Sequence, residues 1–125
     1  TQYFLFSKMK GEILMSKFVN KDDVELNQDT LLWSGNSVTY LHTVTLNDDA
    51  LKFKSLIIII NNRAVEVPII SGSIKNGGIV ADYRCISVDI QSYNQGSKQL
   101  SLVGALWTDS KTNSNTTLTA IYGRY

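Results

Sequence analysis

The sequence predicts an all-β protein: an antiparallel β-sandwich or Greek-key barrel with a short helix or stalk segment at its N-terminus. From Thr30 onward, short apolar or alternating segments follow one another, they are rich in threonine, valine and isoleucine, and polar turns separate them at regular intervals. A chain of 125 residues can bury one core without disulfides or metals. We therefore expect an N-terminal neck or linker, residues 1–29, and one β-sandwich domain, residues 30–125.

The first 29 residues differ from the rest of the chain. Residues 12–18 place apolar side chains at helical intervals, and residues 22–27 form a polar connector. This helix could pack on the core or could end an oligomeric neck. The apolar residues 3–6 lack the basic region and cleavage site of a signal peptide. Because the chain begins at Thr1 and not at Met, we expect it to be part of a longer protein.

The first predicted strand, residues 38–46, alternates apolar and hydroxyl-bearing side chains. Its inward parity holds Val38, Tyr40, His42, Val44 and Leu46, and its outward parity holds Thr39, Leu41, Thr43 and Thr45. Residues 47–49, Asn-Asp-Asp, should then turn the chain.

The next two strands have opposite characters. Residues 53–61 contain four consecutive isoleucines, a β-branched run typical of a central strand covered on both faces. Residues 61–63 offer a tight turn. The strand at residues 64–70 contains Pro68, which favours an edge or a bulge because proline has no amide hydrogen.

The second half continues in the same way. Residues 71–78 form a Gly- and Ser-rich loop, and residues 80–90 carry apolar groups on both parities, which indicates a strand deep in the sheet. A turn at residues 92–97 contains Tyr93, and a strand at 98–108 follows. After a polar loop at 109–115, the last strand, residues 117–122, should pair back into the sheet.

Charge excludes two classes of partner. Twelve basic residues against eleven acidic ones give a net charge of +1, which supplies no long-range field for nucleic acid or anionic lipid. The longest apolar run, residues 56–60, is too short to cross a bilayer. We therefore predict neither nucleic-acid binding nor membrane insertion.

Catalytic groups are scarce, so we predict neither an enzyme nor a bound metal or cofactor. One histidine and one cysteine cannot build a zinc site, and no nucleophile elbow or phosphate-binding loop is present. His42 is either a core histidine bonded to a backbone carbonyl or a ligand contact, and Cys85 should be a buried thiol. The carboxylates Glu66, Asp82, Asp89 and Asp109 are scattered, with no sign of a glycosidase pair.

Aromatic and polar residues near strand ends suit a different task. Saccharides are bound by aromatic faces and by polar side chains that bridge hydroxyl groups. Near the predicted strand ends and turns lie Trp33, Trp107, Tyr83, Tyr93 and Tyr122, close to Arg84, Asp89, Asn94, Gln91 and Asp109. These residues form a binding surface, or the aromatic ones serve the core.

Three stretches carry a family resemblance: residues 31–36 with the threonine-rich strand after them, residues 86–91 with the turn and the strand reaching Trp107, and the closing residues 119–125. Together they resemble C-terminal head domains of receptor-binding proteins from the tail tips of phages infecting Gram-positive bacteria, above all lactococcal siphophages. The resemblance covers roughly residues 30–125.

The resemblance implies a homotrimeric β head that binds host cell-wall saccharide for adsorption. It implies location at the phage tail tip, assembly in the bacterial cytoplasm, and contact with other tail or baseplate proteins through a preceding segment. By position, Asp89 matches the acidic residue of the family's site and Trp107 its aromatic residue, whereas Ser87 stands where those heads carry histidine. Together with Arg84, Tyr93 and His42, which suit ligand contact by residue type and position, Asp89 and Trp107 make up the candidate ligand-binding set.

Other functions remain open. A structural baseplate or other virion subunit without saccharide binding is the main alternative, followed by a module that recognises a protein receptor and by other lectin-like modules. A cell-wall hydrolase has the least support. The exposure of Trp107 and Tyr93 should separate binding from packing roles.

Overall fold

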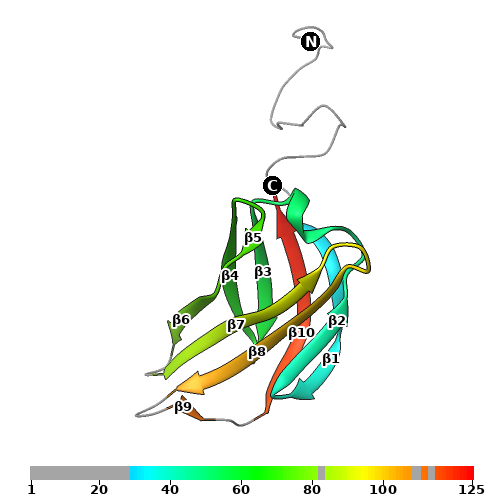
Figure 1. Ribbon diagram of the computed structural model, residues 1–125. Coiled ribbons are helices and arrows are strands. Elements are labelled where there is room, and N and C mark those ends of the chain that lie inside the picture. Colours follow the sequence, from blue (N-terminus) through cyan, green and yellow to red (C-terminus); the bar gives the residue numbers. More distant parts are fainter. Residues whose placement is uncertain (1–28, 82–83, 108–110, 113–114) are drawn as a thin grey trace, which may run out of the picture.

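The computed structural model describes residues 29–81, 84–107, 111–112 and 115–125, and they form two antiparallel sheets (Figure 1). The first sheet has the order β1-β10-β3-β4-β5, with β1 Thr30–Thr39, β10 Thr116–Arg124, β3 Ser55–Ile60, β4 Arg63–Ile70 and β5 Ser73–Ile74. The second has the order β2-β8-β7-β6, with β2 Leu41–Thr45, β8 Gln99–Trp107, β7 Arg84–Asn94 and β6 Gly77–Ala81; β9, Lys111–Thr112, pairs with β8. The predicted all-β, antiparallel fold is confirmed.

The core lies between the two sheets. Leu32, Ile58 and Val65 from the first sheet and Val88 and Leu102 from the second are fully buried in one cluster. In Figure 1 the two sheets form separate layers, as in a β-sandwich. Alternate residues of β3 and of β4 lie in this cluster, namely Leu56, Ile58 and Ile60, and Val65 and Val67.

The central isoleucine strand lies where its sequence predicts. β3 pairs with β10 on one side and with β4 on the other. Ile58 and Ile60 face the core, and Ile57, on the opposite face, is also buried. Asn61 and Asn62 link β3 to β4 with φ of 49° and 59°, the geometry of a type I′ hairpin turn. The predicted turn is confirmed.

Two other predictions are confirmed. The C-terminal strand β10 lies inside the first sheet, between β1 and β3. β4 is the edge over most of its length because β5 pairs only with Ile69 and Ile70, so Pro68 sits on a mostly exposed strand.

The predicted strand at residues 38–46 is wrong as one unit. β1 ends at Thr39, the chain bends at Tyr40, and β2 begins in the other sheet. His42, Val44 and Leu46 are buried as expected, but Val38, which belongs to β1, is 56% exposed.

The predicted strand at residues 80–90 is also wrong. It is a hairpin: β6 ends at Ala81, β7 begins at Arg84, and these two residues are partners across the ladder. The reversal leaves Val80 76% exposed while Ile86 and Val88 are buried. Its apolar groups on both parities therefore do not mark one strand covered on both faces.

Other boundaries shift less. The loop predicted at 71–78 contains β5 and the start of β6, and Tyr93 lies in β7 and not in a turn. A 3₁₀ helix, η1 at Ala50–Lys52, follows the turn at 47–49 and was not predicted. The predicted N-terminal helix and most of the 109–115 loop lie outside the described residues.

Candidate functional site

The five candidate ligand-binding residues do not form one site. Arg84 begins β7 and Tyr93 lies near its end. Since a strand rises about 3.3 Å per residue, the backbones of these two residues lie roughly 30 Å apart. Trp107 is the ladder partner of Cys85, at the Arg84 end, and Asp89 lies midway along β7, partly buried opposite Val103. Trp107 and Tyr93 therefore lie at opposite ends of the β7–β8 hairpin.

His42 lies in the core. Its side chain is fully buried, and its Nδ1 and Nε2 lie 2.9 Å from Ser37 Oγ and 2.8 Å from Thr116 Oγ1. Because the Thr116 hydroxyl donates to Thr39 O at 3.3 Å, it accepts from His42, so Nε2 carries the proton and Nδ1 accepts from Ser37. The core interpretation holds, with hydroxyl partners in place of the expected carbonyl, and burial keeps His42 from contacting a ligand.

The Trp107 groove is a depression of about 480 Å³ on the outer face of the second sheet. It is lined by Gly78, Ile79, Val80, Cys85, Ile86, Ser87 and Trp107. Trp107 is partly buried and its Nε1 donates to Ser87 Oγ at 2.9 Å. Side chains other than Ser87 offer this groove mainly carbon and sulfur, so it suits apolar contact.

Cys85 is exposed, so the predicted buried thiol is wrong. It lies on the parity of β7 opposite to Ile86 and Val88, which face the core. The alternation alone could not say which parity of this strand would be covered.

The Tyr93 groove is a second depression, of about 420 Å³, at the other end of the hairpin. Three segments line it: η1, the β4–β5 turn with β5, and the end of β7 with the turn after it. They contribute Leu51; Gly72, Ser73 and Ile74; and Ile90, Gln91, Ser92, Tyr93 and Gln95. The lining of this groove thus combines hydroxyl and amide side chains with aliphatic ones.

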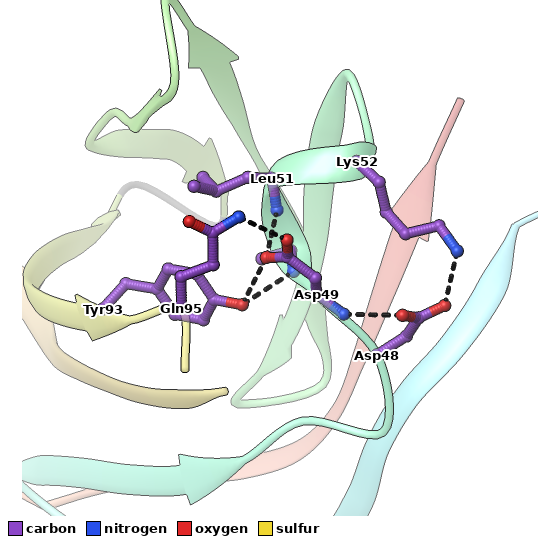
Figure 2. A network of polar contacts seen from close by, with 7 residues as sticks. Asp48, Asp49, Leu51, Lys52, Tyr93 and Gln95 are labelled. Atoms are coloured by element: carbon purple, nitrogen blue, oxygen red, sulfur yellow. Dashed lines mark hydrogen bonds and ion pairs between the residues drawn. The ribbon is translucent and has the colours of Figure 1, made fainter. Parts of the chain in front are cut away.

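Asp49 holds this groove together (Figure 2). Its Oδ1 accepts from Tyr93 Oη at 2.7 Å and from Leu51 N at 3.0 Å, and its Oδ2 accepts from Gln95 Nε2 at 2.7 Å. Burial alone would raise the pKa of Asp49, but the hydrogen bonds from Gln95, Tyr93 and Leu51 outweigh it and lower that pKa. The carboxylate thus joins η1 to the end of β7.

The Tyr93 hydroxyl makes two hydrogen bonds. Besides donating to Asp49, it accepts from Ala50 N at 2.9 Å. Burial and then the hydrogen bond to Asp49 raise the pKa of Tyr93 to about 12. The ring is held in one orientation, with part of it packed against the core and part lining the groove.

A β-bulge places Gln91 at the groove. In the β7–β8 ladder Ile90 pairs with Leu102 and Ser92 pairs with Ser101, so Gln91 is the extra residue. The backbone amide of Ile90 is held by Asn76 Oδ1 at 2.8 Å. Among the described residues, the Gln91 amide makes one contact, of 3.5 Å with Asp89 O, so donors and an acceptor remain for a ligand.

Sequence reasoning found part of this groove. Tyr93 was a candidate, and Gln91 was among the polar residues near aromatic ones. Ser73, Gln95 and Asp49 were missed because they come from three separate segments. The one local signal was Gly72, whose φ of +74° marks the tight turn that brings Ser73 to the groove.

Within the described part of the chain, no cluster of three or more His, Cys, Asp or Glu side chains could hold a metal ion. In the same part, no helix has the length and apolarity needed to span a membrane. No protein-family model, no curated protein and no solved structure matches this chain.

Proposed function

We propose that this chain is the head domain of a phage receptor-binding protein, which binds a host cell-surface saccharide in the Tyr93 groove. One observation carries the proposal: an open groove is lined by hydroxyl and amide side chains and by a tyrosine ring that Asp49 holds in place. The sequence resemblance to phage tail-tip heads supports the biological setting.

The lining of the groove meets the two demands of sugar binding. A pyranose ring has C–H groups that pack on aromatic or aliphatic surfaces, here Tyr93, Ile74 and Ile90. Its hydroxyl groups both donate and accept, as do the side chains of Gln91 and Ser92. Because Tyr93 is held by hydrogen bonds before a ligand arrives, little conformational entropy is lost on binding.

Trimerisation belongs to the same proposal. Three heads that engage a repetitive glycan together gain avidity, so each site can be weak. Val38 and Leu41 flank the bend between β1 and β2 and are 56% and 49% exposed. We assign subunit contacts to this bend, with other tail or baseplate proteins bound through the N-terminal side and the whole located at the virion's tail tip.

Calorimetric titration with cell-wall polysaccharide from candidate Gram-positive hosts tests the proposal. We expect saturable binding to the polysaccharide of one host. Gln91→Ala should weaken it about fivefold to tenfold, the loss expected for one hydrogen-bonding group. Gln99→Ala is the matched control, because Gln99 is an exposed amide on β8 outside the groove. Equal affinity of the two variants would remove the groove from the site, and no binding to any host's polysaccharide would overturn the function.

The Trp107 groove favours a second candidate function, that of a structural virion subunit. Its apolar lining and the exposure of Val80 suit burial against another protein more than contact with a sugar. Val80→Asp separates the two functions: a structural subunit should fail to enter assembled tails, whereas an adhesion head should still bind polysaccharide as the unchanged chain does.

A further inference from the structure

The Tyr93 groove has almost no ionisable lining. Among the described residues that line it, Tyr93 alone has a side chain that can titrate, and the polar remainder is made of Ser73, Gln91, Ser92 and Gln95. Hydroxyl and amide groups carry no net charge, and they can both donate hydrogen bonds to a neutral ligand and accept them from it.

Tyr93 adds no charge of its own. With a pKa of about 12, its hydroxyl stays protonated at physiological pH. That hydroxyl already donates to Asp49 and accepts from Ala50 N, so the ring offers a ligand its face and edge.

The carboxylate behind the groove, Asp49, already has hydrogen-bond donors on both of its oxygens. All three hydrogen bonds to Asp49 come from within the protein, from Tyr93, Leu51 and Gln95. Asp48 forms an ion pair with Lys52 at 2.8 Å, and the two lie on the side of Asp49 away from Tyr93 (Figure 2). A sugar would therefore have to displace one of these donors to bond to Asp49 directly.

An anionic ligand would lose free energy on entering. A phosphodiester or carboxylate must give up its hydration, and proteins offset this cost with Arg, Lys or aligned backbone donors. The lining of the groove as described holds neither Arg nor Lys.

From these contacts we infer the ligand class: the Tyr93 groove takes an uncharged, polyhydroxylated glycan segment and discriminates against segments that carry phosphodiester or uronate groups. This inference rests on the proposed function. Gln91 and Gln95 then read neighbouring hydroxyl groups, and Leu51, Ile74 and Ile90 meet the C–H face of the sugar.

The test uses the full chain and polysaccharide from the host that binds it. The polysaccharide is divided into neutral and anionic fractions, and part of the anionic fraction is treated with hydrofluoric acid to cleave its phosphodiesters. We expect the neutral fraction to bind, and its Kd to change less than about twofold between about 50 mM and 500 mM NaCl, since screening has no net charge to act on.

The outcomes separate the inference from the function. If only the untreated anionic fraction binds, and its affinity falls about tenfold or more over the same salt range, the ligand class is overturned and the adhesion function stands. If neither fraction binds, both fail. The variant Gln91→Lys tests whether the neutral fraction binds in this groove. This variant should bind the neutral fraction more weakly, whereas Gln99→Lys should bind that fraction as the unchanged chain does.

Discussion

At the scale of single residues, Gly104 shows how closely the two sheets approach. It lies on β8 facing β10, and a Cβ added there would collide with Ile60 Cδ1 and lie 2.6 Å from Thr116 Oγ1. Gly104→Ala should lower the free energy of unfolding by about 1–3 kcal/mol, the usual cost of overpacking a core. Urea denaturation measures it. Gly96→Ala, in an exposed turn, is the control and should stay within about 0.5 kcal/mol.

His42 should make stability depend on pH. Burial lowers the pKa of His42 below its ordinary value of 6.5. The unfolded chain therefore takes up a proton at a pH where the folded chain does not, and the free energy of unfolding falls as pH drops below about 6.5, by at most about 1.4 kcal/mol per pH unit.

Urea denaturation between about pH 7.5 and pH 5.5 would show this slope, because carboxylates titrate mainly below this range. His42→Gln keeps one donor and one acceptor for Thr116 and Ser37 but cannot titrate. We expect the variant to be less stable yet nearly independent of pH. An equal slope in both proteins would assign the effect to other groups.

At the scale of elements, the β3–β4 turn depends on backbone conformation. Asn61 and Asn62 both have positive φ, and Asn61 Oδ1 also accepts from Thr117 N at 2.8 Å, which ties the turn to β10. Asn62→Val should lower the free energy of unfolding by about 1–2 kcal/mol, because β-branched residues disfavour the left-handed region. Asn62→Gly should preserve or raise it. Thermal unfolding of the two variants tests this prediction, and equal midpoints for both would contradict the turn assignment.

At the scale of the whole molecule, the proposed trimer can be tested directly. Light scattering at dilute concentration should give three times the chain mass. Leu41→Glu, which places a charge beside the bend between β1 and β2, should shift the mass to that of a monomer. Ile70→Glu is the matched control because Ile70 is a similarly exposed aliphatic residue on β4. A monomeric unchanged chain, or equal loss of mass in both variants, would reject this interface.

Local chemistry settled much of the fold in advance. The isoleucines of β3, the alternation of Leu100 and Leu102 on β8 and the Asn61-Asn62 turn were all visible in sequence, because periodicity, β-branching and turn preference act between neighbours. Composition likewise indicated one β domain with few charges.

Only the tertiary structure decided which residues distant in the sequence contact one another. A single alternating pattern runs through Val38 and His42, yet they belong to different sheets, and Cys85 is exposed because nothing described covers its face of β7 enough to bury it. The candidate site depends on the bond from Tyr93 to Asp49, 44 residues earlier, and on a bulge that aims Gln91. Sequence spacing cannot encode such contacts, because they form only when separate segments pack around a shared core.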